Sequence, residues 1–431
     1  MKARLPGYSA AILLVAMLSA CGSRAPQQRA PSANNNLAYL YGQEAAALEF
    51  NARIYHGPDQ ASVIHFMLRT HDLLYKSDGG GAPYRAVVRI TYEALSDWTG
   101  KTLIDSASTL VKDVSEEPAE DRELIGQLEM RRNEQRSFVI RITAEDLNRG
   151  TRSTRLIAVD KAVANVRQNF LPIEADRDLP IFDDHLSGPG QLRVRCEQYT
   201  DRTLLGAYYQ QEFGLPAPVF AEQGPVTVDT SPDSTFTVQV GADGLFALDL
   251  QQRGFYHFRP DTSTQAGFTL FVLGTDHPRV RAAAEMVPPL RYITSMQEYE
   301  RMLSDTSVRK AVERFWLDAA GSKDRARSAI RAYYERVENA NRYFTSFVEG
   351  WRTDRGLVHI IFGTPNTIHK TAQGEAWIYG EETNLMSLTF RFKQRDLPFT
   401  DNDLQLERDP MLKGAWYRNV ESWRNGRIVQ N

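Results

Sequence analysis

The feature of this sequence that most constrains its fold is a long series of short segments in which apolar and polar residues alternate. The segments run from about residue 50 to about residue 280. Alternation with a period of two places the apolar side chains on one face of an extended strand. Turn and loop compositions, such as residues 77–83 (SDGGGAP) and 115–121 (SEEPAED), separate the segments, and no helical pattern intervenes. This arrangement predicts antiparallel β-sandwiches.

The alternating segments fall into two groups. The first group comprises residues 61–70, 85–95, 124–132, 136–147 and 153–161. The second group comprises residues 190–199, 204–214, 234–241, 245–252, 254–260 and 267–274. From these groups we predict two immunoglobulin-like antiparallel sandwiches, residues 38–163 and 164–285. The pattern leaves open a single larger composite sandwich.

The last third of the chain changes from strand patterns to helix patterns. After Pro288 and Pro289, apolar residues recur at intervals of three and four, which predicts helices over residues 296–319 and 323–349. Three strands are then predicted, at residues 357–363, 375–381 and 385–393. We therefore expect residues 286–431 to form an α+β module in which helices pack on a small antiparallel sheet. The fold class of the whole chain is predicted to be mainly β.

The first twenty residues have the pattern of a signal peptide. A cationic start precedes an apolar stretch, residues 10–18, that is too short to span a bilayer. The Leu-Ser-Ala-Cys sequence that ends at Cys21 resembles the bacterial lipoprotein signal, which implies cleavage before Cys21 and attachment of lipid to it. The alternative is an ordinary secretory peptide followed by an incidental cysteine. Gly22 stands where an Asp would imply retention in the inner membrane, so the resemblance implies the outer membrane.

A flexible tether is predicted to follow the signal. Residues 21–37 are rich in Pro, Gln, Ser and Asn and offer almost nothing to bury. No acidic cluster follows Cys21, which favours the periplasmic side of the membrane over the cell surface.

Charge and cysteine content exclude two classes of protein. The formal net charge is −3 with both signs interspersed, whereas a nucleic-acid-binding surface needs a basic excess. The chain contains 2 cysteines. With Cys21 acylated, Cys196 has no partner within the chain, so we expect a buried thiol and no disulfide framework.

The segment Gly350-Trp351-Arg352-Thr353-Asp354, here called the GWRTD segment, is predicted to be a corner from helix to strand. Gly350 is suited to the left-handed conformation that ends a helix. The ring of Trp351 is expected to pack on the last helical turn, beside Phe347 and Val348. The side chains of Thr353 and Asp354 can accept backbone N–H groups in the turn. Gly356 is expected to lead into the next strand, and Gly363 and Pro365 to close it.

This segment resembles the signature of the GWxTD-domain family, which is named for it. The residues that match beyond the pentapeptide are Gly356, Val358, Ile360, Phe362, Gly363 and Pro365. The resemblance covers about residues 290–431. It implies outer-membrane-associated lipoproteins of Bacteroidota and related phyla with β-rich N-terminal regions, and it implies no reaction.

A second resemblance starts at Gly363-Thr364-Pro365 and continues at Trp377-Ile378-Tyr379. It is similar to small outer-membrane lipoproteins of the SmpA/OmlA type, in which the segment before Gly-x-Pro is helical. Those proteins are accessory subunits of the β-barrel assembly machinery.

Few residues suggest chemistry. Asp354, His359 and His369 are candidates for an acid/base group or a metal site, but their spacing is not that of metal ligands. Asp183 and His185 could coordinate a cation or lie in a solvated loop. The sequence shows no zinc-protease, phosphate-loop or serine-hydrolase motif. We therefore expect no metal, no cofactor and no catalytic residue.

These observations predict a non-catalytic outer-membrane lipoprotein that faces the periplasm and serves as a docking or scaffold subunit of an envelope complex. Its expected partners are the membrane, through the lipid on Cys21, and an outer-membrane barrel or another lipoprotein. The candidate docking anchors are aromatic: Trp377, Tyr379, Trp416, Tyr417 and Trp423. The alternative is a lipoprotein that binds envelope glycan or lipid, or a hydrolase whose residues converge only in the fold.

Overall fold

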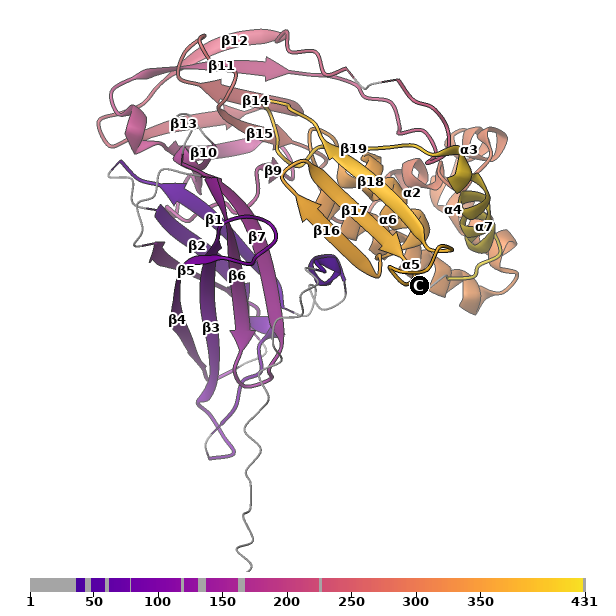
Figure 1. Ribbon diagram of the computed structural model, residues 1–431, viewed down its shortest axis with the longest axis horizontal. Helices are drawn as coiled ribbons and strands as arrows, with labels where there is room; N and C mark the ends of the chain where they lie inside the picture. The colour runs from indigo at the N-terminus through magenta and orange to yellow at the C-terminus, as the bar shows by residue number, and fades with distance from the viewer. Residues whose placement is uncertain are drawn as a thin grey trace, which may run out of the picture. The chain divides into compact units, whose positions relative to one another are not determined.

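The computed structural model of the chain describes residues 36–42, 48–58, 62–77, 79–117, 120–130, 137–161, 167–224 and 227–428 (Figure 1). They all belong to one compact unit, Asn35–Asn431. The predicted signal peptide, Cys21 and the tether up to residue 35 lie outside the described residues. Where the chain is described, none of its helices is both long enough and apolar enough to cross a bilayer.

The first part of the chain is a two-sheet antiparallel sandwich, here called sandwich 1. Its strands are β1 (Phe50–His56), β2 (Ser62–Arg69), β3 (Tyr84–Leu95), β4 (Leu103–Ser115), β5 (Glu123–Met130), β6 (Ser137–Asp146) and β7 (Arg152–Asp160). The sheets have the orders β1-β2-β5 and β4-β3-β6-β7 (Figure 1). Alternate residues of β3, such as Val88, Ile90 and Tyr92, face Phe66 and Ile140 in one apolar core. Strands β1 and β4 were absent from the prediction.

A second sandwich, sandwich 2, follows with a core of its own. Its strands are β8 (Leu171–Glu174), β9 (His185–Leu186), β10 (Gly190–Arg195), β11 (Thr203–Tyr209), β12 (Ser234–Gln239), β13 (Leu245–Leu250), β14 (Gly254–Arg259) and β15 (Phe268–Val272). The sheet orders are β13-β10-β8 and β12-β11-β14-β15-β9, with only the β15–β9 pair parallel among the described pairs. Val194, Phe258 and Leu270 fill the core, and Cys196 is buried among them. The mainly β fold class is confirmed.

The C-terminal α+β module combines helices with a four-stranded antiparallel sheet of order β16-β17-β18-β19 (Figure 1). The helices are α2 (Ala283–Leu290), α3 (Met296–Leu303), α4 (Val308–Ala320), α5 (Lys323–Phe344), α6 (Asp354–Phe362) and α7 (Lys413–Arg424). The strands are β16 (Thr367–Thr371), β17 (Gly374–Tyr379), β18 (Leu388–Gln394) and β19 (Leu404–Leu406). The helix predicted over residues 296–319 is two helices, α3 and α4. Helix α2 contains the two prolines that were expected to precede the helices.

The prediction of a strand at residues 357–363 is wrong, because this segment is helix α6. Every residue from Arg355 to Phe362 is buried, so this part of the helix has no face exposed to solvent. A short apolar run cannot be assigned to helix or strand from its periodicity alone. Strand β18 also begins three residues later than predicted, at Leu388, and leaves Leu385 and Met386 in the preceding turn.

The segment before sandwich 1 belongs to the core of the C-terminal module instead (Figure 1). The backbone N–H of Leu37 donates to the carbonyl of Ile368 in β16 over 2.9 Å, and Leu37 and Leu40 are buried in the module's core. The Tyr41 ring meets those of Phe344 and Trp377, with centroids 5.0 and 5.9 Å away. No local pattern predicted this contact, since it joins residues more than 300 positions apart.

Sandwich 2 and the C-terminal module share a second apolar cluster. Phe255 of β14 and Phe271 of β15 pack there with Phe347, Val348 and Phe399. The Phe255 and Phe399 ring centroids are 5.0 Å apart. Strands β14 and β15 therefore support the module from outside its own sheet.

We expect Leu37→Ala to destabilise β16 and β17, because the side chain is only 3% exposed and its loss leaves a cavity. Such a truncation costs about 2–5 kcal/mol. Faster amide hydrogen exchange at residues 367–379 would report the loss. Tyr39→Ala, in the same segment but 37% exposed, serves as the matched control. Equal exchange in the two variants would contradict a structural role for this segment.

Candidate functional site

The GWRTD segment forms a corner between two helices, not the predicted corner from helix to strand. Residues Gly350–Arg352 make a 3₁₀ turn between α5 and α6. Gly350 does not have a left-handed backbone. Its lack of a side chain is needed for another reason, because a Cβ atom would lie 1.8 Å from the Ala340 carbonyl oxygen of α5. Glycine at this position therefore permits close approach of two backbones.

Thr353 joins the two glycines of the corner. Its hydroxyl donates to the Gly350 carbonyl over 2.8 Å and accepts the Gly356 N–H over 3.0 Å, which caps α6 at its N-terminus. A Cβ on Gly356 would lie 1.9 Å from the Gly350 oxygen, so Gly356 also serves close packing. Gly363, with φ +85°, ends α6, and Pro365 is buried just before β16. The predicted acceptor role of Thr353 is confirmed.

Trp351 is held mainly through its backbone. Its N–H donates to the Asn341 side-chain oxygen over 3.1 Å, and its carbonyl accepts the Tyr292 hydroxyl over 2.8 Å. The ring is half-buried and meets Tyr292 edge-on, with centroids 6.1 Å apart. The expected packing on Phe347 and Val348 is wrong, because α5 ends at Phe344 and those two residues turn toward sandwich 2.

Asp354 is fully engaged in structural bonds. Its carboxylate accepts the Leu406 N–H of β19 over 2.7 Å and forms an ion pair with Arg408 over 2.6 Å. The two side chains are 10% and 7% exposed. Arg408 also donates to the Ala217 carbonyl, in the loop after β11, over 3.1 Å. Asp354 thus links α6 to β19 and, through Arg408, to sandwich 2.

A buried ion pair lies beside the corner and was missed by the sequence analysis. Arg355 of α6 and Glu375 of β17 have side chains 1% and 0% exposed, with Nη1 and Oε1 3.3 Å apart. Lys370 Nζ lies 3.1 Å from the same carboxylate, and the Trp377 indole N–H donates to it over 3.0 Å. Burial opposes ionisation of Glu375, but Lys370 and Arg355 lower its pKa to about 2. Tyr41 donates its hydroxyl to Glu375 over 3.3 Å.

A small hollow adjoins the corner. Its volume is about 50 Å³, and Arg352, Asp354, Arg395 and Asp403 contribute to its lining. Burial raises the pKa of Asp403 to about 6, although Arg395, 3.2 Å away, opposes the rise. Perturbed carboxylates often mark functional sites. A space of this size admits water rather than a substrate.

The three candidates for acid/base or metal chemistry do not converge. Asp354 is paired with Arg408. The His359 ring is buried edge-on against Phe344, and burial together with Arg336 lowers its pKa to about 3, so it is neutral. His369 lies at the surface with its Nε2 2.9 Å from Glu382.

The candidate docking anchors are mostly interior residues. Trp377, Tyr379, Trp416 and Trp423 are 0%, 5%, 5% and 1% exposed. These rings fill the module's core, so they cannot present a surface to a partner. Tyr417, at 53% exposed, is the only one of the five that solvent reaches.

Asp183 and His185 do not form a cation site. They connect sandwich 2 to the segment before Gly350, and this connection is here called the His185 junction. His185 Nδ1 lies 2.8 Å from an Asp183 oxygen, and Nε2 lies 2.9 Å from the Ser346 carbonyl, just before the GWRTD segment. Both partners are acceptors, so both bonds form only when the imidazole is protonated and charged. Burial opposes that charge, but Asp183, Asp184 and the Ser346 carbonyl together outweigh it and raise the pKa of His185. Asp184 pairs with Arg53 of sandwich 1 over 2.7 Å.

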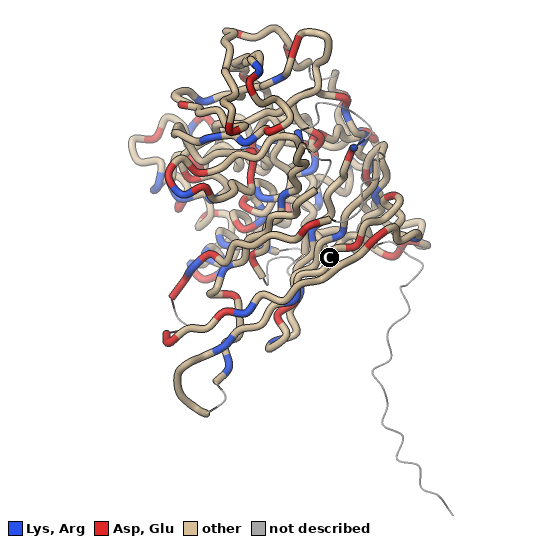
Figure 2. Tube along the Cα trace, turned by 90° about the vertical axis from the view of Figure 1, so that its left-hand side faces the viewer, with Lys and Arg blue, Asp and Glu red and all other residues tan. Residues whose placement is uncertain are grey.

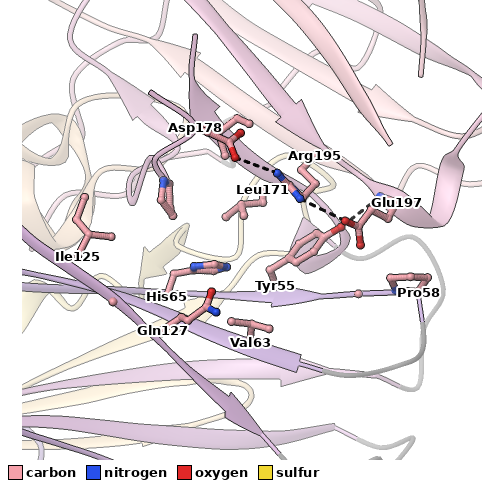
Figure 3. Close-up of a pocket in the computed structure, with 14 residues that line it drawn as sticks. Tyr55, Pro58, Val63, His65, Ile125, Gln127, Leu171, Asp178, Arg195 and Glu197 are labelled. Atoms are coloured by element: carbon pink, nitrogen blue, oxygen red, sulfur yellow. Dashed lines mark hydrogen bonds and ion pairs between the residues drawn. The ribbon is translucent and has the colours of Figure 1, made fainter. Parts of the chain in front are cut away.

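The hollow drawn in Figure 3 lies between β1, β2 and β5 of sandwich 1 and β8 and β10 of sandwich 2. Its volume is about 660 Å³. Arg195 lies 3.4 Å from both Asp178 and Glu197, so its charge is partly satisfied. Burial lowers the pKa of His65 to about 4, which leaves a neutral imidazole facing the hollow. The lining suits a small, polar, uncharged ligand.

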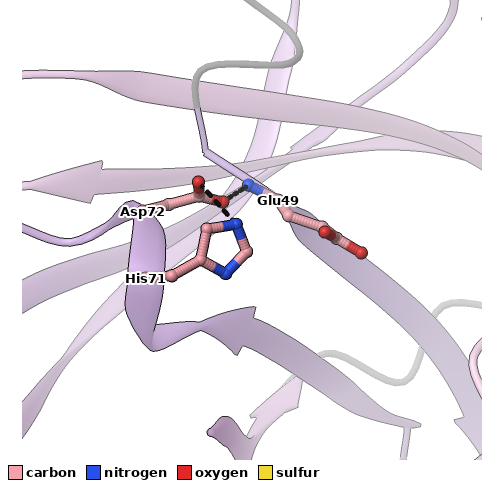
Figure 4. A group of neighbouring side chains, drawn as sticks. All are labelled: Glu49, His71 and Asp72. Carbon is pink, nitrogen blue, oxygen red and sulfur yellow. Dashed lines mark hydrogen bonds and ion pairs between the residues drawn. The ribbon is translucent and has the colours of Figure 1, made fainter. Parts of the chain in front are cut away.

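One group in the described part of the chain has the composition of a metal site: Glu49, His71 and Asp72 (Figure 4). Asp72 already accepts the Glu49 N–H over 2.6 Å and lies 3.1 Å from His71 Nε2. The other nitrogen of His71 is 3.0 Å from Asp121. The candidate ligand atoms of His71 and Asp72 therefore have protein partners.

Comparison with known proteins supports the domain. The model of the GWxTD domain matches residues 254–425. The match begins at the first residue of β14, so it includes the two strands of sandwich 2 that pack on the module. The matched region thus starts earlier than the resemblance suggested, at residue 254 rather than about residue 290. No curated protein matches the chain.

Two solved structures are similar to about half of the chain. One is red sea bream transglutaminase, 9% identical, with 52% of this chain and 31% of that chain covered and a TM-score of 0.18. The other is BcpA, the major pilin subunit of Bacillus cereus, 8% identical, with 52% and 63% covered and a TM-score of 0.13. The chain spans less than two thirds of either protein. Likenesses this slight carry no argument about fold or function.

We expect Asp354→Asn to destabilise the module by about 3–5 kcal/mol, because it leaves the buried Arg408 charge unpaired. Adding Arg408→Gln should restore part of the loss, since the unpaired charge is then removed. Denaturant unfolding and hydrogen exchange at residues 404–406 measure both effects. Glu349→Gln is the control, because its pair with Arg352 is 30% and 25% exposed and should contribute only about 0–1 kcal/mol. Additive losses at Asp354 and Arg408 would contradict the pairing.

The His185 junction predicts a pH dependence of stability. A histidine whose pKa is raised by folding stabilises fully below its unfolded pKa of about 6.5, and the contribution is lost as pH rises through the folded value. The difference in unfolding free energy between the parent and His185→Gln should therefore shrink above about pH 6.5. Asp183→Asn should weaken the same dependence, because Asp183 raises this pKa. A difference that stays constant with pH would show that His185 is not charged.

Proposed function

We propose that the protein is a non-catalytic outer-membrane lipoprotein that faces the periplasm and acts as a docking or scaffold subunit of an envelope complex. The observation that carries this proposal is the way in which the Asp354 carboxylate is bonded. The one carboxylate of the GWRTD segment is bound by the Arg408 guanidinium and the Leu406 N–H. A carboxylate held in this way is an anchor for neighbouring backbone and not a general base. The segment thus serves to join α6, β19 and sandwich 2.

The N-terminal contact supports attachment to a membrane through this domain. The Asn36 side-chain oxygen accepts the Ile368 N–H of β16 over 3.0 Å, and the Leu37 N–H donates to the Ile368 carbonyl. Asn36 lies fifteen positions after Cys21, and a chain of that length reaches at most about 50 Å. A lipid on Cys21 would therefore be attached to the chain through residues that pack in the GWxTD module. The helical α6 before Gly363-Thr364-Pro365 also agrees with the resemblance to SmpA/OmlA-type lipoproteins.

Strand β4 offers a surface for a protein partner. It is 13 residues long, and within the described strands it pairs only with β3. Leu103, Leu110 and Val114 on this strand are 54%, 51% and 56% exposed. A long free edge with exposed apolar side chains suits addition of a strand from another protein. Figure 2 shows basic and acidic residues interspersed along the chain. The partner therefore need not carry an excess of one charge.

A second candidate function is binding of a small envelope glycan in the 660 Å³ hollow of Figure 3. The Tyr55 ring, the Gln127 amide and the neutral His65 are groups that bind sugar hydroxyls and ring faces. A solitary protein whose glycan affinity falls in His65→Ala would favour this candidate over docking.

We expect the protein to copurify stoichiometrically with an outer-membrane barrel or another lipoprotein from solubilised envelopes. Leu110→Lys with Val114→Lys should abolish the association, because charges at the strand edge oppose strand addition. Leu317→Lys, on α4 and 39% exposed, is the matched control. Cys21→Ser should move most of the protein out of the membrane fraction, because the tether then carries no lipid. Retention of the partner by the β4 variant, or a protein that purifies alone, would contradict docking through this edge.

A further inference from the structure

The connection between β17 and β18 presents two fully exposed apolar side chains. Leu385 is 101% exposed and Met386 is 85% exposed. They are the central residues of a turn in which the Ser387 N–H donates to the Asn384 carbonyl over 3.0 Å. The Asn384 side chain accepts the Met386 N–H over 2.9 Å and fixes the same turn. The loop's own hydrogen bonds therefore hold these side chains out in solvent, where apolar groups are unfavourable.

The loop is also braced at its start. The Asn384 N–H donates to the Glu381 carbonyl over 3.0 Å, and the Ser387 hydroxyl donates to the same carbonyl over 2.7 Å. Glu382 lies 2.9 Å from His369 of β16, which ties the loop to the neighbouring strand. Residues 381–387 thus form a defined projection, here called the Leu385–Met386 tip.

The base of this loop coincides with the point where the N-terminal segment reaches the module. The Asn366 carbonyl accepts the Asn36 side-chain N–H over 2.8 Å. The Asn366 side-chain oxygen accepts the N–H of Gly380, the residue before the loop, over 2.7 Å. One residue, Asn366, therefore binds both the start of the described chain and the foot of the tip.

We propose that the Leu385–Met386 tip inserts into the bilayer that holds the lipid of Cys21 and makes a second membrane contact. The proposal rests on the lipid anchoring proposed above. Cys21 precedes Asn36 by fifteen residues, so the anchored bilayer lies within about 50 Å of the loop's base. A lipid on a flexible tether leaves the protein free to rotate, whereas a rigid tip in the same bilayer fixes which face of the GWxTD module meets the membrane. Two weak signals together give stable attachment where one does not.

The charges around the tip indicate which lipids suit it. Glu381 and Glu382 precede the apolar pair, and Glu382 is paired with His369. Carboxylates at a membrane surface are repelled by anionic headgroups. We therefore infer a preference for zwitterionic lipid.

The test uses the mature chain, residues 21–431, with Cys21→Ser, so that neither lipid nor signal peptide is present, and flotation with a large excess of phosphatidylethanolamine–phosphatidylcholine vesicles. The parent chain should float with the vesicles, and Leu385→Ser with Met386→Ser should reduce the bound fraction by about tenfold, because two apolar side chains leave the bilayer. Leu110→Ser with Val114→Ser removes an equally apolar exposed pair from β4 and should leave flotation unchanged. Raising the fraction of phosphatidylglycerol should weaken binding of the parent chain.

Three outcomes would overturn the proposal: a parent chain that does not float, a tip variant that floats like the parent, or a β4 control that loses as much binding as the tip variant. The vesicle assay does not depend on modification of Cys21. Mass spectrometry of the N-terminal peptide from envelopes shows separately whether Cys21 carries a lipid. Failure of the tip and failure of the lipid anchor are therefore distinguishable.

Discussion

The buried ion pair between Arg355 and Glu375 is the interaction on which the C-terminal half of the structure depends. Both side chains are out of contact with water, and an unpaired charge in that position would be strongly destabilising. Both terminal nitrogens of Arg355 and both oxygens of Glu375 therefore have protein partners. Arg355 donates to the Asn402 carbonyl over 2.9 Å, and Asn402 in turn donates to the Thr345 carbonyl at the end of α5. The pair thus sets the positions of α6, β17 and the segment before β19 together.

The same pair is also connected to the segment before sandwich 1 and to sandwich 1 itself. Tyr41, from the segment before sandwich 1, donates its hydroxyl to Glu375. Lys370, which neutralises that carboxylate, also lies over the Trp98 ring of sandwich 1, 4.4 Å from its centroid. Arg408 and Asp354 make the corresponding connection to sandwich 2. The GWRTD segment lies where these connections meet, which explains its residue types by geometry and packing. A protein built in this way is suited to holding surfaces in fixed relation at a membrane, as the proposed docking role requires.

The sequence predicted best the elements whose pattern is local. Strand β3 alternates buried and exposed residues over its length, and it was found within a residue or two of its bounds. Strand β4 was missed because its sequence carries Ser, Thr, Asp and Lys, as befits an edge strand with little to bury. Helix α6 was mistaken for a strand because its residues from Arg355 to Phe362 are buried on all sides and leave no amphipathic pattern. Thr353 and Gly363 did mark its two ends, and the capping pattern could have corrected the assignment. Arg355 and Glu375 were not singled out, because each is the second residue of its element, where a charge is ordinarily solvated.

The sequence by itself determined the mainly β class, the two groups of strands, the α+β module and the GWxTD domain, because these follow from periodicity and from a contiguous motif. It also located the turns and the glycines of the corner. Only the tertiary structure decided what those glycines are for, which aromatic rings are interior, and that the first described residues complete the core of the last domain. These facts depend on contacts between residues far apart in the chain. The free energy of burying a ring or pairing a charge depends on neighbours in space. Those neighbours cannot be identified from the linear order of the residues.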